Sequence, residues 1–322
     1  MSNIRHQFIL ATFIAALAFI LAALAQAAGP GFNPWQNDFN PASGAGIPPG
    51  GNPNGMGPWA TRVMLATSQD GLSFTRTGQM VADQAGVPAA LVDHDGYVRV
   101  YYQAWLNHAD TQAGDFPAFA IRNAEGQWFH HKIVMDQWTD RAVDAHVVLL
   151  PDGRYRLYFM EDIGGHRLSI CSGTSNDGKH FTRDEGFRLI PANDAVYDPM
   201  VLKTGDQYLL VAGPDGSYHA TSADGLDFSP QGPFGVEGRQ FMAWSGVALS
   251  GGGYRLYGNF QGEGMLTSVF SADGHNWTTE PGWRMDGRPE FASEGSGPMP
   301  DNGACALPDG SYLMAYLVRI PD

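Results

Sequence analysis

A short turn phrase recurs along this chain at a spacing of about fifty residues. It reads TSQDGLSF at 67–74, TSNDGKHF at 174–181, TSADGLDF at 221–228 and FSADGHNW at 270–277, with a weaker copy, RNAEGQWF, at 122–129. The shared glycines are Gly71, Gly126, Gly178, Gly225 and Gly274. Copies at a regular spacing of this size are typical of repeat architectures, in which each repeat is one supersecondary unit.

A second phrase alternates with the first. It reads DHDGYVRVYY at 93–102, LPDGRYRLYF at 150–159, TGDQYLLVAG at 204–213, GGGYRLYGNF at 251–260 and LPDGSYLMAY at 307–316. A turn followed by alternating aromatic and aliphatic residues indicates the second arm of a β-hairpin. Each unit therefore has two hairpins and four strands. Five such units predict an all-β, five-bladed β-propeller with four-stranded antiparallel blades.

The order of the hairpins predicts how the ring closes. The first hairpin, at about 60–80, is an outer one, and the last, at about 303–319, is an inner one. We expect them to combine into one blade, because pairing strands from both ends of the chain removes the exposed sheet edges. The inner strands are then expected to start near 86, 142, 196, 242 and 299.

The N-terminal region predicts export. Arg5 precedes an apolar run, and Ala25-Gln26-Ala27 is a small-x-small cleavage site, so 1–27 is interpreted as a signal peptide. The protein is then secreted or periplasmic, although the run is long enough for an uncleaved membrane anchor. Residues 28–58, rich in Gly, Pro and Asn, are expected to form a flexible arm or to lie on the propeller, which occupies 59–322.

The net charge of the chain argues against some classes of partner. The chain has a net charge of −14, which argues against nucleic acid or an anionic membrane as partner, since phosphates are bound by basic surfaces. We expect a monomer.

Cys171 is assigned to the third strand of one blade and Cys305 to the innermost strand of a blade that is not its neighbour. A disulfide needs Cα atoms within about 7 Å, so two buried thiols are predicted.

The aspartates of the repeated turn are expected to be structural. In this turn the Asp side chain can accept hydrogen bonds from turn amides and the glycine supplies a positive φ. These turns lie at the face opposite the starts of the inner strands. Function is therefore expected at the other face, which we call the mouth.

Acids and aromatic residues gather in the loops and strand starts expected at the mouth, which suits a carbohydrate ligand. Structural alternatives stay open: a turn cap for Asp144, a strand entry for Asp198, a channel plug for Trp244 and an inner-strand tie for His146. The candidate catalytic acids are Asp144, Asp198 and Glu237. The candidate substrate-binding residues are Trp105, His108, His146, Glu161, Arg239, Trp244, Asn259 and Asp301.

The phrases DPMVLKTGDQYLLV and VPAALVDHDGYVRVYYQAW resemble the five-bladed furanosidase clan, which includes arabinanases, β-xylosidases, invertases and levansucrases. The resemblance implies that Asp144 matches the second-blade Asp, which stabilises the transition state or tunes a neighbour. It places Asp198, or else Glu237, near the third-blade acid. The first blade departs from the pattern, because Val87 stands where the clan has its nucleophile or base; Asp83 is the nearest acid.

The sequence thus predicts a glycoside hydrolase, with a non-catalytic glycan-binding propeller as the alternative. A weaker likeness to sialidases rests on the repeated turns and on FRLIP at 187–191. No cofactor is predicted. The His130-His131 pair lacks the spacing and cysteine partners of a zinc site, while a structural calcium ion on the propeller axis stays an open alternative.

Overall fold

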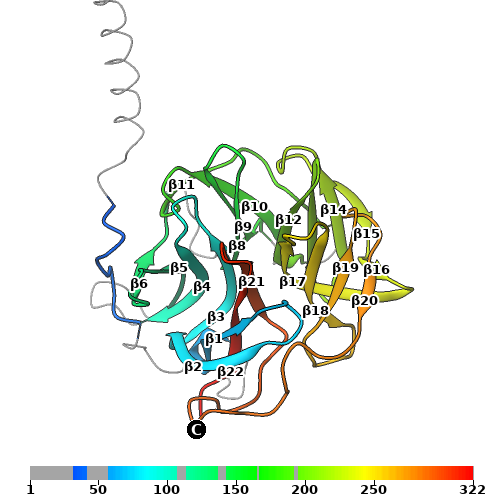
Figure 1. Cartoon of the computed structure of the whole chain (residues 1–322). Coiled ribbons are helices and arrows are strands. Elements are labelled where there is room, and N and C mark those ends of the chain that lie inside the picture. The colour runs from blue at the N-terminus through cyan, green and yellow to red at the C-terminus, as the bar shows by residue number, and fades with distance from the viewer. Residues whose placement is uncertain are drawn as a thin grey trace, which may run out of the picture.

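Five antiparallel sheets surround a common axis in the computed structural model of the chain (Figure 1). The structure describes residues 32–41, 57–106, 114–136, 143–164, 167–191 and 195–321. Apart from the 3-10 turn η1 (Pro58–Ala60), the regular elements of these residues are all strands. The prediction of a five-bladed β-propeller is confirmed.

Each blade is one sheet, whose strands are named from the axis outward. Blade 1 consists of β3 (Ala85–Val92), β4 (Val98–Leu106), β5 (Gly114–Arg122) and β6 (Trp128–Lys132). Blade 2 consists of β8 (Val143–Leu149), β9 (Tyr155–Asp162), β10 (Leu168–Ser175) and β11 (His180–Arg183), with β7 (Val134–Asp136) added parallel to β11. Blade 3 consists of β12 (Tyr197–Thr204), β13 (Gln207–Gly213), β14 (Tyr218–Ser222) and β15 (Ser229–Gly232).

The last two blades are built from strands in the same order. Blade 4 consists of β17 (Arg239–Ala248), β18 (Tyr254–Phe260), β19 (Thr267–Ser271) and β20 (Thr278–Glu280), and the short β16 (Gly235–Val236) pairs with the start of β17. Blade 5 consists of β21 (Asn302–Ala306), β22 (Tyr312–Arg319), β1 (Thr61–Ser68) and β2 (Thr75–Ala82). Blade 5 therefore contains strands from both ends of the propeller, as the hairpin order predicts.

The ring is closed by an eight-pair ladder between β1 and β22, which runs from Thr61 opposite Arg319 to Ser68 opposite Tyr312. The inner strands β3, β8, β12, β17 and β21 gather around the middle of the molecule (Figure 1), and each contacts its neighbours in the ring. Their starts agree with the predicted ones to within about three residues. The ends of the inner strands that form the mouth are therefore brought together from all five blades.

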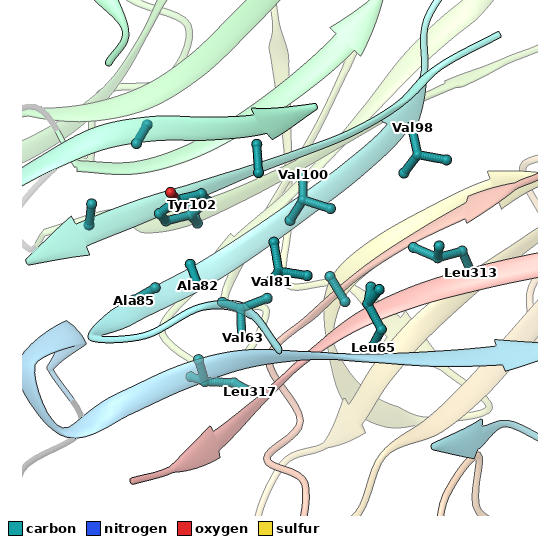
Figure 2. Close-up of a cluster of buried hydrophobic side chains, with 14 of the residues drawn as sticks. Val63, Leu65, Val81, Ala82, Ala85, Val98, Val100, Tyr102, Leu313 and Leu317 are labelled. Atoms are coloured by element: carbon teal, nitrogen blue, oxygen red, sulfur yellow. The ribbon is translucent and has the colours of Figure 1, made fainter. Parts of the chain in front are cut away.

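The hydrophobic core lies between successive blades. Between blades 5 and 1, for example, Val63, Leu65 and Leu313 pack with Val100 and Tyr102 (Figure 2), and all five side chains are buried. Side chains of a strand alternate between its two faces, so each blade buries both faces against its neighbours. The outer strands are more exposed, as the uniformly exposed β15 shows.

The repeated turns are structural, as predicted. In the blade 3 turn, Asp224 Oδ1 accepts hydrogen bonds from the amides of Leu226 at 2.8 Å and Asp227 at 3.0 Å. The glycine that follows, Gly225, has φ of 73°. The amide hydrogen bonds from Asp227 and then Leu226 lower the pKa of Asp224 to about 2, so the turn is held by a carboxylate.

The turns also bind the neighbouring blade, which the sequence did not reveal. From β9 in blade 2, Arg156 donates to the Asp224 carbonyl and Tyr158 to the Gly225 carbonyl, both at 2.8 Å. We call such an arginine and tyrosine, two residues apart on a second strand, an Arg-x-Tyr latch. Two further latches join Arg99 and Tyr101 to the turn at Asp177-Gly178, and Arg255 and Tyr257 to the turn at Asp70-Gly71.

Part of the N-terminal arm lies against blade 1. The Asp38 amide donates to the His130 carbonyl of β6 at 2.8 Å, and the Asp38 carboxylate pairs with Lys179 of blade 2 at 2.7 Å. Phe32 packs edge-on against His131, with ring centroids 4.8 Å apart. Residues 32–41 thus cover the outer edge of blade 1. The predicted signal peptide lies outside the described residues.

The two cysteines can be compared with their prediction. Cys171 and Cys305 are both free and buried, so the prediction of two buried thiols is confirmed. Among the residues that the structure describes, no helix has the length and apolar character needed to cross a membrane.

Candidate functional site

Four of the five inner strands carry a register slip at the mouth. In β3, β8 and β12 the register with the second strand slips, so that extra residues bulge out of the ladder. The inserted pairs are Val87-Pro88, Asp144-Ala145 and Asp198-Pro199. In β17 the extra residue is Trp244, and Asp301 directly precedes β21. β-Bulges of this kind re-aim a side chain and are common near active sites.

The bulges place these side chains in one small pocket on the propeller axis, which we call the axial pocket. Asp144 and Asp198 have positive φ angles of 56° and 51°, a region that Asp and Asn tolerate better than most residues. The pocket has room for about one water molecule. It is lined by Val87, Pro88, Ala89, Asp144, Ala145, His146, Asp198, Pro199, Trp244, Asp301 and Asn302.

Three carboxyl groups from blades 2, 3 and 5 interact in this pocket, and we call Asp144, Asp198 and Asp301 the carboxyl cluster. Burial raises the pKa of Asp198 to about 7; the charge of Asp301 adds to this rise, and a hydrogen bond with Asp144 acts against it. Burial also raises the pKa of Asp301 to about 7, and the charge of Asp144 contributes. Like charges in a desolvated site favour the protonated form of a carboxyl group, so the cluster retains protons close to neutral pH.

The polar groups beside the cluster are tied to the scaffold. The Trp244 indole donates to Asn259 Oδ1 at 2.8 Å, and the Asn259 amide donates to the Glu263 carbonyl at 3.0 Å. Asn302 is buried; it accepts a hydrogen bond from the Ser245 hydroxyl and donates to the Pro300 carbonyl. The indole ring of Trp244 is therefore held at the pocket wall by Asn259, whose own amide is hydrogen-bonded to the backbone.

His146 lines the axial pocket, but its ring ties blades 2 and 3 together. Its Nε2 lies 3.0 Å from the Val201 carbonyl on the next inner strand. Burial lowers the pKa of His146 to about 4, and this hydrogen bond acts against the shift. The ring is thus neutral at physiological pH and donates to a backbone group, which agrees with the inner-strand tie that the sequence left open.

Other sequence candidates lie outside the axial pocket. Glu161 is buried and accepts hydrogen bonds from Arg183 Nη2 at 2.7 Å and from Cys171 Sγ at 3.1 Å. Trp105 is buried and packs edge-on against Trp59, with ring centroids 5.6 Å apart. These three interactions hold strands and the N-terminal turn together, so the structure does not bring Glu161 and Trp105 to the carboxyl cluster.

The β16–β17 hairpin carries two more candidates away from the cluster. Glu237 is exposed at its turn. Arg239 forms an ion pair with Glu263, and its guanidinium lies 3.9 Å from the centroid of the Phe260 ring. His108 lies outside the described residues. Asp83, the acid nearest in sequence to Val87, pairs with Arg62 at 3.0 Å.

The ionisable side chains that line the axial pocket are mostly acidic. Its lining contains three aspartates and, among the described residues, neither lysine nor arginine. In the same part of the chain there is no group of three or more His, Cys, Asp or Glu side chains arranged to hold a metal ion. The arrangement can therefore donate and accept protons, and it offers an aromatic face beside the acids.

From the sequence, Asp301 is predicted to bind substrate and is not grouped with the candidate catalytic acids. The signal was present, because Asp301-Asn302 stands at the start of an inner strand in the repeat, as Asp144 and Asp198 do. The MPDNGAC phrase does not share the Asp-Pro spelling of the blade 3 phrase, so the equivalence emerges only once the five strands are compared by their position in the ring.

Comparison with known proteins identifies the fold. No protein-family model matches this chain, and no curated protein matches its sequence. Among solved structures, a glycosyl hydrolase from Bacteroides ovatus is similar over 89% of this chain and 96% of its own, with a TM-score of 0.52 and 15% identity. A second solved structure is similar over 72% of this chain and 83% of its own, with a TM-score of 0.50 and 16% identity. It is described with the statement that the GH130 family of mannoside phosphorylases contains glycoside hydrolases that target beta-1,2 mannosidic linkages in Candida mannan. A protein of unknown function from Dyadobacter fermentans covers 79% and 83% (TM-score 0.51, 12% identity). At these identities the shared feature is the propeller fold.

Proposed function

We propose that this protein is a glycan-acting enzyme of the glycoside hydrolase type, with the axial pocket as its active site. The observation that carries the proposal is the carboxyl cluster, in which two of three acids have a pKa of about 7. Glycoside hydrolysis is usually performed by two carboxyl groups, one protonated and one ionised. Glycoside hydrolases among the similar structures support the same reading through the fold they share with this chain.

The contacts within the cluster support different roles for its members. Asp198 is the proposed general acid, because its raised pKa keeps it protonated and its hydrogen bond with Asp144 fixes the direction of the carboxyl group. It gives its proton to the glycosidic oxygen as the bond from that oxygen to the anomeric carbon breaks. Asp301 is the proposed base: in its ionised form, which is populated as the pH approaches its pKa of about 7, it takes a proton from the water that attacks the anomeric carbon. The net reaction is the addition of one water across one glycosidic bond.

The size of the axial pocket fits this division of labour. Because it has room for about one water molecule, a sugar ring is expected to lie over its opening, with the attacking water below. Trp244, fixed by Asn259 at 2.8 Å, provides the aromatic face on which a sugar ring can stack. The lining carries no cation among the described residues, which does not favour the acidic sugar that a sialidase would bind.

One observation favours a second candidate, a non-catalytic glycan-binding propeller. Val87 occupies the bulge of blade 1, where the resemblance to the furanosidase clan implies a catalytic acid.

We also propose that the protein is exported and monomeric, on the basis of its N-terminal sequence and the closed ring.

A substrate screen distinguishes the two candidates. The protein purified from residue 28 onward is incubated with 4-nitrophenyl furanosides and pyranosides and with plant and microbial polysaccharides, next to an Asp198→Asn variant. Sugar release by the wild type and not by the variant supports the hydrolase. Binding without release, measured by calorimetry, supports the glycan-binding propeller. If the screen shows neither sugar release nor binding, the proposal that the ligand is a glycan is refuted.

A further inference from the structure

Val87 adopts a backbone conformation that valine strongly disfavours. Its φ is 46°, and it is the one β-branched residue with positive φ among the described residues. A β-branched residue in this region is a genuine outlier, and the left-handed conformation costs about 1–2 kcal/mol for an L-residue. The following residue, Pro88, adds to the strain, because a residue before proline prefers an extended backbone.

The neighbouring blades show that this strain is avoidable. Asp144 and Asp198 occupy the matching bulges of blades 2 and 3, with similar φ angles of 56° and 51°. Asp, Asn and Gly adopt such angles far more readily than valine. Since strained conformations persist chiefly at functional sites, the valine side chain itself is expected to have a use.

The surroundings of Val87 indicate what that use is. Its strand, β3, contacts β21 on one side and β8 on the other. The titratable groups that line the axial pocket with it are Asp301 before β21, Asp144 and His146 on β8, and Asp198 on β12. Val87 thus stands in the ring between Asp301 and Asp144, two acids whose charges interact.

A second feature next to this bulge also lowers stability. Gln103 lies on β4 directly opposite Gly86, the residue before Val87. Its side chain is 2% exposed, and within the described residues neither its amide oxygen nor its amide nitrogen has a hydrogen-bond partner. An unsatisfied buried amide is rare and calls for an explanation. The start of blade 1 therefore contains two neighbouring features that lower the stability of the fold, the strained backbone of Val87 and the unsatisfied amide of Gln103.

We propose that Val87 is a positioning residue of the axial pocket, whose apolar side chain keeps bulk solvent, as distinct from the single attacking water, and a further charge away from the carboxyl groups on either side. This rests on the proposed function for its purpose, but its physical effect can be measured without a substrate. A dry, uncharged wall at this place makes ionisation of the carboxyl cluster costly. The general acid can then keep its proton at neutral pH.

The stability of the protein as a function of pH reports this effect. In the folded protein Asp198 and Asp301 hold protons up to a pH of about 7, compared with the ordinary 3.8. The folded state therefore binds more protons than the unfolded chain between these values, and stability falls as the pH rises through them. Anything that admits water or a hydrogen-bond donor to the cluster should weaken this fall.

The test compares two substitutions. Val87→Asn relieves the backbone strain and brings an uncharged donor, whereas Val87→Ile keeps a β-branched apolar side chain and is the matched control. We expect Val87→Asn to raise Tm at pH 8 by about 2 °C or more and to flatten the change of Tm between pH 4 and 8. Val87→Ile should keep the pH dependence of the wild type.

The outcomes separate the inference from the proposed function. A Val87→Asn variant less stable than the wild type at pH 8, or one with an unchanged pH dependence, would overturn the role of Val87. If a substrate is found, the pH profile of kcat/KM for Val87→Asn should move down by about one pH unit, and an unmoved profile would also count against the role. If no glycan is turned over or bound, the proposed function fails, while the pH dependence of Tm still decides the inference.

Discussion

Removing one acid of the carboxyl cluster should stabilise the protein while abolishing its activity. Asp301→Asn keeps the size of the side chain and leaves the backbone carbonyl that accepts from the Leu317 amide. Burial and the charge of Asp144 raise the pKa of Asp301 to about 7, compared with 3.8 for an ordinary Asp. An amide at this position does not ionise, so the variant avoids the free-energy cost of placing a charge there in the folded state.

The magnitude follows from the size of this shift. Each pKa unit corresponds to about 1.4 kcal/mol, so the penalty for an ionised Asp301 is on the order of 4 kcal/mol at full strength, and about 2 kcal/mol if its neighbours take up protons in compensation. The penalty is absent below pH 4, grows as the pH rises and is complete above pH 7. Asp301→Asn should therefore match the wild type in stability at pH 4 and exceed it at pH 8.

Urea denaturation at pH 4, 6 and 8, followed by tryptophan fluorescence, measures this difference. For Asp301→Asn we expect a gain in unfolding free energy of about 2–4 kcal/mol at pH 8 that shrinks steadily towards pH 4. A variant that is less stable than the wild type at pH 8, or equally shifted at all three pH values, would show that Asp301 is not a desolvated acid in a charged cluster.

Two further predictions concern the scaffold. Tyr158→Phe removes the hydroxyl that donates to the Gly225 carbonyl at 2.8 Å and leaves a buried acceptor unpaired, so we expect a loss of about 1–3 kcal/mol in urea denaturation; an unchanged midpoint would refute the Arg-x-Tyr latch. Burial raises the pKa of the Cys171 and Cys305 thiols to about 12, so neither should react with Ellman's reagent at pH 8 until the protein unfolds; rapid labelling of the native protein would contradict their burial.

The blade pattern could be predicted because it is local. Asp-Gly turns and the alternation of apolar residues act within a hairpin, and Gly225 with its positive φ and Asp224 with its amide bonds behave in the structure as the sequence indicated. The short strands β7 and β16 were not predicted, because two or three residues carry no periodicity. They form through pairing with β11 and β17, which the sequence of the segment does not encode.

The site was predicted only in part, because β-bulges decide where side chains point. Asp144 and Asp198 were expected at the mouth, since they start inner strands, but their meeting with Asp301 depends on register slips that no local pattern marks. Glu161 shows the converse case. A side chain one position along a strand points to the opposite face, and Glu161 faces Arg183 and Cys171 of its own blade.

The Arg-x-Tyr latches were missed for a different reason. Arg156 and Tyr158 fit the alternating pattern of a second strand and needed no other explanation in the sequence. Their partners lie 68 and 67 residues away in the next blade. Such long-range pairing emerges from the stacking of the blades, although the recurrence of Arg and Tyr two residues apart in three of the five second phrases was visible.

The central claim is that chemistry occurs at the axial pocket and not at the repeated turns of the opposite face. The most direct test measures kcat on a substrate from the screen for Asp198→Asn and, as the matched control, Asp224→Asn. Both substitutions remove one aspartate from blade 3. Asp198→Asn should lower kcat by at least about a hundredfold, the scale of losing a catalytic acid. Asp224→Asn should lower stability by roughly 1 kcal/mol through weaker turn hydrogen bonds and leave kcat per folded molecule unchanged. Full activity of Asp198→Asn together with loss of activity in Asp224→Asn would contradict the account.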